Sequence, residues 1–190
     1  MHAALMLLAC ALLSAASIEP AAAQDQAAAW SLLKQPGHVV FMRHAEAPGT
    51  ADPPGYTLED CASQRNLVDS GRDHARRTGE AFRNNGVAFQ RVLTSPWCRC
   101  KETALLAMGR EADVFAPLSN LVGRPQHAAG QVASLKAYLA TLDTGTRVLF
   151  VTHGIVINAL TGITPASGEM IIVKPGPAGD PQVAGRLRVE

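Results

Sequence analysis

Apolar residues along this chain of 190 residues fall into short runs separated by segments with helical spacing. Short, mostly apolar runs are typical of strands buried on both faces of a parallel sheet. They predict strands over 39–42, 91–94, 147–151 and 170–173. A weaker run over 183–189 predicts a last strand that pairs as a hairpin with the strand before it, after a turn at 175–181.

Between these runs, apolar residues recur every three to four positions, which indicates helices with one buried face. The predicted helices span 70–84, 96–108, 130–142 and 154–160. Asp69 or Ser70 is the expected cap of the first helix, and Pro96 the expected first-turn residue of the second. Residues 24–35 form an Ala-rich lead-in, and residues 47–56, rich in Pro and Gly, predict a loop.

Strands that alternate with helices indicate an α/β fold, here a three-layer α/β/α sandwich with a mainly parallel sheet. The chain shows no internal repeat and no second domain. In such sheets ligands bind at the carboxyl ends of the strands. The loop over 47–56 directly follows the first strand, so we expect it to form a wall of any site there.

The first 23 residues differ from the rest of the chain. An Ala- and Leu-rich core is followed by Ala21-Ala22-Ala23, an Ala-x-Ala cleavage pattern, although no Lys or Arg precedes the core. The pattern predicts a secretory signal peptide over 1–23 and a folded domain over 24–190, periplasmic or secreted and without stable membrane insertion after cleavage. A buried N-terminal helix is the alternative interpretation, and Cys10 is a poor match to a lipidation site.

Composition sets further bounds. The chain is 47% hydrophobic and 17% charged, which suits one domain with a substantial core. Its formal charge of +1 provides no general field for nucleic acid or an anionic membrane. An oxidising destination makes one disulfide involving Cys61 plausible, with either Cys98 or Cys100 as its partner. Zinc is the rival interpretation, but Cys-x-Cys with one distant Cys lacks the usual paired spacing.

Chemistry-bearing residues follow three of the predicted strands. Arg43 and His44 end the first strand, Arg99 follows the second in Ser-Pro-Trp-Cys-Arg, and His153 follows the third in Thr-His-Gly. Guanidinium groups match phosphate oxygens bidentately, and an imidazole can attack phosphorus. Together these residues predict a site for a phosphoryl group.

In these motifs the chain resembles the histidine phosphatase superfamily, which has the phosphoglycerate mutase-like fold. The resemblance covers roughly residues 38–173 and includes Glu102-Thr103-Ala104, Gly168-Glu169 and Gln64-Arg65-Asn66-Leu67. It implies that His44 is the nucleophile and forms a phosphohistidine. It implies further that Arg43, Arg99 and His153 neutralise the phosphoryl oxygens, with no metal and no cofactor. Arg65 is a weaker candidate for a second anion contact, and a structural role is its alternative.

The sequence departs from the family where many members carry a glutamate as general acid. The best local match is Leu118-Ser119-Asn120, and Asn120 cannot donate a proton to an alkoxide. Glu46 lies in the first motif, where it is more often structural. Small size and the Arg-His-Ala-Glu motif most resemble the periplasmic branch that includes lipopolysaccharide core heptose phosphatase. The small cytoplasmic phosphohistidine phosphatases are similarly compact but have no leader.

We therefore expect an exported, metal-independent phosphomonoesterase of the histidine acid phosphatase type. Its partner would be a small-molecule phosphate ester rather than nucleic acid, and the sequence leaves its oligomeric state open. The first alternative is a phosphoanion-binding protein of the same fold with weak or no turnover. The second is an exported structural or interaction protein in which the motifs are relics.

Overall fold

The computed structural model describes residues 21–190. The helices are α1 (Ala21–Leu32), α2 (Asp69–Asn84), α3 (Cys98–Met108), α4 (Ala128–Ala140) and α5 (Gly154–Thr161). The strands are β1 (Val39–Arg43), β2 (Arg91–Thr94), β3 (Asp113–Val114), β4 (Val148–Thr152), β5 (Met170–Pro175) and β6 (Pro181–Leu187). The expected leader lies outside the described residues, apart from its last three positions at the start of α1.

The six strands form one mixed sheet in the order β3-β2-β4-β1-β5-β6. β1 and β2 both pair in parallel with β4, and β3 pairs in parallel with β2. β5 runs antiparallel to β1, and β6 returns as a hairpin partner of β5. The parallel half therefore brings the carboxyl ends of β1, β2 and β4 to the same edge of the sheet, as the α/β prediction requires.

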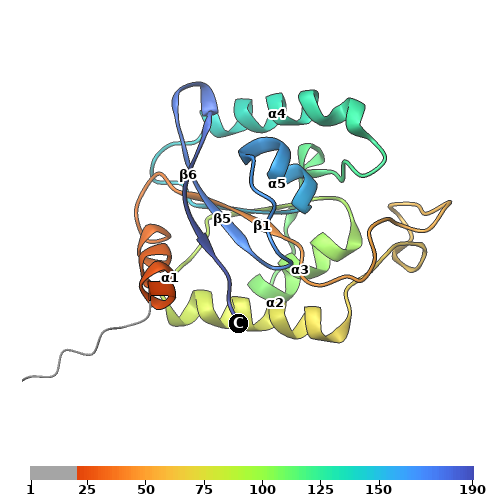
Figure 1. Ribbon diagram of the computed structural model, residues 1–190, viewed down its shortest axis with the longest axis horizontal. Coiled ribbons are helices and arrows are strands. Elements are labelled where there is room, and N and C mark those ends of the chain that lie inside the picture. Colours follow the sequence, from red (N-terminus) through yellow and green to blue (C-terminus); the bar gives the residue numbers. More distant parts are fainter. Residues whose placement is uncertain (1–20) are drawn as a thin grey trace, which may run out of the picture.

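Helices cover both faces of the sheet, so the molecule has three layers (Figure 1). Alternate residues of each strand point to opposite faces. Val40 and Met42 of β1 pack into one core with α1, α2 and α3, and Val39 and Phe41 pack into the other with α4 and α5. The predicted α/β/α sandwich is confirmed, with antiparallel pairing confined to β1 with β5 and β5 with β6.

Two glycines of α2 pack directly against the backbone of neighbouring segments, where no side chain would fit. A Cβ at Gly79 would lie 2.1 Å from the carbonyl oxygen of Ala107 in α3. A Cβ at Gly71 would lie 2.4 Å from the carbonyl oxygen of Glu46, just after β1. Both glycines therefore allow helix backbone to approach a neighbouring segment closely. The second contact ties the start of α2 to the motif that carries His44.

Two predicted helix starts are wrong. Neither expected side chain caps α2, whose N-cap is Val68, because Ser70 Oγ donates to Glu46 Oε2 and Asp69 pairs with Arg72. α3 begins after Pro96, because the backbone of Trp97 is extended (φ −67°, ψ 137°).

Two elements escaped prediction. α1 lies in the Ala-rich lead-in, and β3 consists of two exposed residues at the sheet edge. The other strands and helices occur where the sequence predicts them, with shifts of a few residues at their ends.

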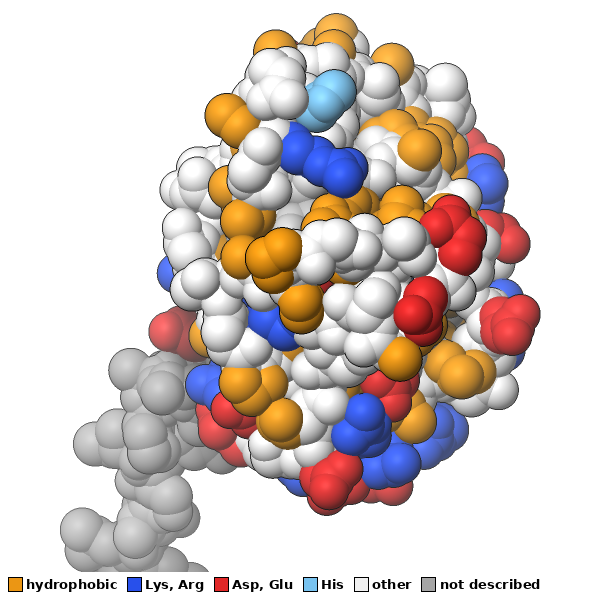
Figure 2. Space-filling view, turned by 90° about the vertical axis from the view of Figure 1, so that its right-hand side faces the viewer, with side chains coloured by type: hydrophobic (Ala, Val, Ile, Leu, Met, Phe, Trp, Pro, Cys, Tyr) orange, Lys and Arg blue, Asp and Glu red, His pale blue; other side chains and the backbone are white. Residues whose placement is uncertain are grey.

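The loop between β1 and α2 projects from one side of the molecule (Figure 1). That side faces the viewer in Figure 2, where hydrophobic side chains lie over the middle of the face and acidic ones gather towards its right and lower edges. No helix within residues 21–190 has the length and apolar character needed to cross a membrane.

Candidate active site

Two neighbouring parallel strands bring the candidate histidines together. Arg43 of β1 is in register with Thr152 of β4, so His44 and His153 follow at the same edge of the sheet. Their ring centres lie 5.4 Å apart, with the ring planes at 70°. Because the backbone N–H of His44 donates to the carbonyl oxygen of Thr152 over 2.8 Å, the pairing of the strands extends into the site.

The surroundings of His44 fix its tautomer. Its Nδ1 lies 2.7 Å from the carbonyl oxygen of Ala45, which can only accept, so Nδ1 carries the hydrogen. The lone pair of the neutral ring is therefore on Nε2. The N–H of Ala45 in turn donates to Thr103 Oγ1 over 3.1 Å. Burial, together with the charges of Arg99, Arg65 and Arg43, lowers the pKa of His44 to about 3, despite the opposing effect of the hydrogen bond to Ala45.

His153 is also neutral and fully enclosed. Burial lowers its pKa well below the usual value, and the neighbouring His44 and arginines act in the same direction. Its Nε2 lies 2.8 Å from Ser95 Oγ, at the end of β2. Its Nδ1 lies 3.5 Å from Nη2 of Arg99, which can only donate. These contacts place the hydrogen of the neutral ring on Nε2, directed at Ser95.

A pocket of about 370 Å³ opens at these strand ends. Four of the five residues proposed for the site from the sequence line it: Arg43, His44, Arg65 and His153. The start of α5 also lines it through Gly154 and Ile155, and the N-terminal end of a helix favours anions. The pocket therefore has the electrostatics of an anion site.

The two arginines of the pocket are oriented by backbone carbonyls. Arg43 Nη1 donates to the carbonyl oxygen of Pro165 over 2.9 Å, and Arg65 Nη1 donates to that of Ala47. Nε of each is buried and has no partner in the described part of the chain. Burial lowers the pKa of both guanidinium groups, and for Arg65 the charge of Arg99 adds to this effect. An anion in the pocket would relieve this crowding of positive charge.

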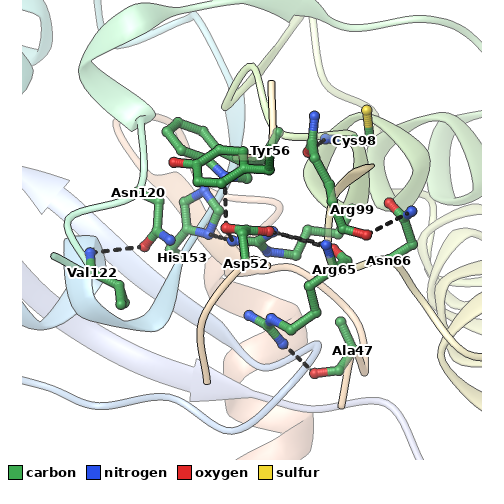
Figure 3. A network of polar contacts seen from close by, with 12 residues as sticks. Ala47, Asp52, Tyr56, Arg65, Asn66, Cys98, Arg99, Asn120, Val122 and His153 are labelled. Carbon is green, nitrogen blue, oxygen red and sulfur yellow. Dashed lines mark hydrogen bonds and ion pairs between the residues drawn. The ribbon is translucent and has the colours of Figure 1, made fainter. Parts of the chain in front are cut away.

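The fifth predicted residue, Arg99, lies behind the pocket rather than in its wall. It is fully buried at the first turn of α3, and both Nη atoms donate to the carboxylate of Asp52, over 2.7 and 3.2 Å. Nη1 also donates to the backbone carbonyl of Arg65 over 3.2 Å. Figure 3 shows this network, with dashed lines joining Asp52 to Arg99.

The pocket wall contains no acidic side chain among the described residues. Asn120 lines it, where the family resemblance leads one to expect an acid, and its Oδ1 accepts from the N–H of Val122 over 3.2 Å. Glu46 is directed elsewhere, since its carboxylate accepts from Ser70 at the start of α2. Neither residue is placed to donate a proton into the pocket.

The predicted disulfide is present, and its partner is now identified. Cys61 pairs with Cys98, the residue before Arg99, while Cys100 is a buried free thiol. The N–H of Cys98 donates to Gln64 Oε1 over 3.0 Å. The segment that ends in Arg65 is therefore fastened both covalently and by hydrogen bonding to the start of α3. Within residues 21–190 no group of three or more His, Cys, Asp or Glu side chains is arranged to hold a metal ion.

Asp52 is the functional candidate that sequence reasoning missed. It lies in a loop whose Pro and Gly content predicts only irregular structure, and no spacing relates it to Arg99. One indirect signal is the predicted disulfide of Cys61 with Cys98 or Cys100, which brings the chain that follows the loop close to Arg99. A buried arginine requires an anionic partner, and the loop is the nearest source of one.

Comparison with known proteins agrees with this geometry. Residues 39–118 match the Histidine phosphatase superfamily (branch 1). No curated protein matches the chain significantly. Among solved structures, the protein histidine phosphatase SixA complexed with tungstate is 23% identical, with a TM-score of 0.59 over 80% of this chain and 96% of that one.

Two further structures have similar folds. The product of open reading frame Rv3214 from Mycobacterium tuberculosis is 18% identical, with a TM-score of 0.58 over 80% of this chain and 97% of that one. A phosphoserine phosphatase from Entamoeba histolytica, in complex with 3-phosphoglyceric acid, is 14% identical, with a TM-score of 0.52 over 80% of this chain and 98% of that one. At these identities the likeness concerns the fold.

Proposed function

Because residues 39–118 match the histidine phosphatase superfamily, we propose that the chain is a metal-independent phosphomonoesterase acting through a phosphohistidine at His44. One observation carries the proposal. Nδ1 of His44 is held by the carbonyl oxygen of Ala45, so the lone pair of Nε2 is left for attack. A nucleophile at a strand end, beside a pocket rich in guanidinium groups, fits phosphoryl transfer.

In the first step, Nε2 of His44 attacks phosphorus. A P–N bond forms, the bond to the leaving oxygen breaks, and that oxygen takes the electron pair. Arg43 and Arg65 line the pocket and balance the charge of the phosphoryl oxygens. In the second step, water attacks phosphorus, the P–N bond breaks, and phosphate leaves while His44 regains its neutral form. Such chemistry depends mainly on positioning and charge stabilisation.

The leaving group defines the substrate class that this pocket favours. Asn120 lines the pocket in place of an acid, so an alkoxide would have to leave without a proton from the wall. Phosphoryl groups on good leaving groups, such as phosphohistidine, acyl phosphates and aryl phosphates, need no such proton. We therefore propose a small phosphorylated substrate with a stabilised leaving group. The phosphatase SixA, whose structure resembles this one, is a protein histidine phosphatase.

We further propose that the protein acts after export, in the periplasm or outside the cell. The leader-like segment over 1–23 supports this location. The pairing of Cys61 with Cys98 also supports it, because structural disulfides persist in oxidising compartments. Fusion of residues 1–30 to a reporter that is active only after export tests the location. Retention of the reporter in the cytoplasm would contradict it.

A second candidate function is the binding of a phosphoanion with weak or no turnover. Asn120 is the observation that favours it, since a wall without an acid limits catalysis but not binding. The two candidates differ in whether phosphate becomes covalently attached to the protein.

Trapping the intermediate separates the candidates. Protein that starts at Gln24 is mixed with an aryl phosphate in EDTA, quenched in alkali, where phosphohistidine survives, and analysed by mass spectrometry. We expect a phosphorylated peptide that contains His44, steady release of the phenol, and neither in His44→Ala. Activity that needs a divalent ion, or full turnover by His44→Ala, would overturn the proposal.

A further inference from the structure

The carboxylate of Asp52 is enclosed by donors from several parts of the chain. Oδ1 accepts from Arg99 Nη1 over 2.7 Å and from the backbone N–H of Arg65 over 3.1 Å. Oδ2 accepts from Arg99 Nη2 over 3.2 Å and from Trp97 Nε1 over 3.0 Å. The side chain of Asp52 is 2% exposed, and that of Arg99 is not exposed. A loop residue is thus one of the most completely hydrogen-bonded groups of the site.

This ion pair continues towards the nucleophile. Arg99 Nη2 faces Nδ1 of His153 over 3.5 Å, and the ring of His153 meets the ring of His44 edge to face. A buried chain therefore runs from Asp52 through Arg99 and His153 to His44. The pocket lies at its far end, where His153 and His44 are among the residues that line it.

We infer that Asp52 is a positioning residue for phosphoryl transfer: its carboxylate fixes the guanidinium of Arg99 in its orientation towards His153. The inference rests on the proposed function and deepens it.

Charge balance supports this arrangement. Three guanidinium groups surround two neutral imidazoles, and one carboxylate offsets one of the three positive charges. A phosphate monoester carries a charge of about −1.5 to −2 near neutral pH, so it would offset the two positive charges that remain.

The rival interpretation is that Asp52 occupies a phosphate site and is displaced by substrate. Four donors hold the carboxylate, and two of them, the indole of Trp97 and the N–H of Arg65, would lose their partner if it left. Burial favours the protonated form of Asp52, but the hydrogen bonds and charge of Arg99 outweigh burial and keep its pKa below the usual value. A carboxylate bound in this way is part of the framework.

Asp52→Asn tests the inference, because the new amide replaces one accepting oxygen with an NH₂ group. That group cannot accept a hydrogen bond from the guanidinium of Arg99. Asp60→Asn is the matched control: it lies in the same loop, and Asn can still accept from the N–H of Ala62, as Asp60 does. We expect Asp52→Asn to lower kcat by about 10- to 100-fold with KM changed less than about threefold, since misplacement of catalytic groups costs rate. Asp60→Asn should leave both constants unchanged.

Two readouts separate positioning from a merely structural role. Two-dimensional ¹H–¹⁵N spectra of the imidazoles should show His153 protonated on Nε2 in the wild type and redistributed between tautomers in Asp52→Asn. The double variant Asp52→Asn/Arg99→Gln should be no slower than Arg99→Gln alone, because both changes break the same chain.

The outcomes that would overturn the inference are distinct. Tighter binding of inorganic phosphate and faster turnover by Asp52→Asn would show that Asp52 occupies the phosphate site. If the loss of kcat in the double variant equals the product of the losses in the two single variants, Asp52 and Arg99 act independently. If Asp52→Asn fails to fold, Arg99→Lys, which keeps the charge but not the fork, should show the same change at His153. The spectra and phosphate binding need no turnover, so an inactive wild type would reject the proposed function and leave this test intact.

Discussion

The imidazoles of His44 and His153 meet edge to face inside the protein, with their centres 5.4 Å apart. Burial is the main cause of the lowered pKa of each ring, and the nearby arginines add to it. Two neutral rings in contact are stable only while neither takes up a proton. The site therefore links the chemistry of the nucleophile to the stability of the fold.

We expect the free energy of unfolding to fall as the pH drops below about 6.5. The pKa of His44 is about 3 in the folded protein, against 6.5 for a free imidazole. The unfolded chain therefore binds a proton at a higher pH than the folded chain does, so the stabilisation is present above 6.5 and is lost as the pH falls towards 3. Between pH 7 and pH 5 this residue alone accounts for about 2 kcal/mol.

Urea unfolding at several pH values checks this expectation. His44→Asn, whose amide can still donate to Ala45, should lose less stability between pH 7 and pH 5 than the wild type. His127→Gln replaces an exposed imidazole and serves as the control. Equal pH dependence in wild type and His44→Asn would show that His44 titrates normally in the folded protein.

Removal of the disulfide by Cys61→Ser/Cys98→Ser should lower the free energy of unfolding by about 3–4 kcal/mol. The bridge spans a sequence separation of 37 residues, and cross-linking a loop of this size restricts the unfolded chain by about that amount. We also expect a higher KM for aryl phosphate, because the segment ending in Arg65 loses its covalent attachment to α3. Urea titration and initial-rate kinetics measure the two effects, and an unchanged KM would mean that hydrogen bonds alone position Arg65.

Gly79→Ala should lower the free energy of unfolding by about 2–4 kcal/mol, because the new methyl group would meet the carbonyl oxygen of Ala107 at 2.1 Å. Gly130→Ala is the matched control. It lies in α4, and a Cβ there would meet nothing within 4 Å, so the same substitution should stabilise the helix by about 1 kcal/mol. Opposite signs in thermal unfolding would confirm close packing of α2 on α3, and two stabilised variants would contradict it.

Turnover should depend steeply on the acidity of the leaving group. Asn120 cannot protonate an alkoxide, so aryl and acyl phosphates should react far faster than alkyl phosphates. Asn120→Glu should accelerate the alkyl esters selectively, and Asn120→Gln is the control without an acid. A series of phosphates with graded leaving-group pKa values measures the dependence. A flat series, with no gain from Asn120→Glu, would show that another group supplies the proton.

The sequence predicted what depends on local pattern. Continuous apolar runs located the buried strands, and the residues after β1 and β4 located the two histidines, because adjacent parallel strands end at one edge. The position of Arg99 behind the pocket could not be predicted in this way. It depends on Asp52, and nothing local in a Pro- and Gly-rich loop encodes an ion pair across the site. β3 was missed because two exposed residues form no pattern.

The Cys-Arg-Cys segment of α3 affects how the disulfide between Cys61 and Cys98 forms. Residues two apart on a helix are rotated by about 200°, so Cys98 and Cys100 point to opposite sides once α3 has formed. Cys98 meets Cys61, and Cys100 is enclosed in the core beside His153. The docked helix therefore selects the correct thiol, and oxidation that follows folding needs no isomerase to correct it. A cell that oxidises the chain before α3 docks loses that selection.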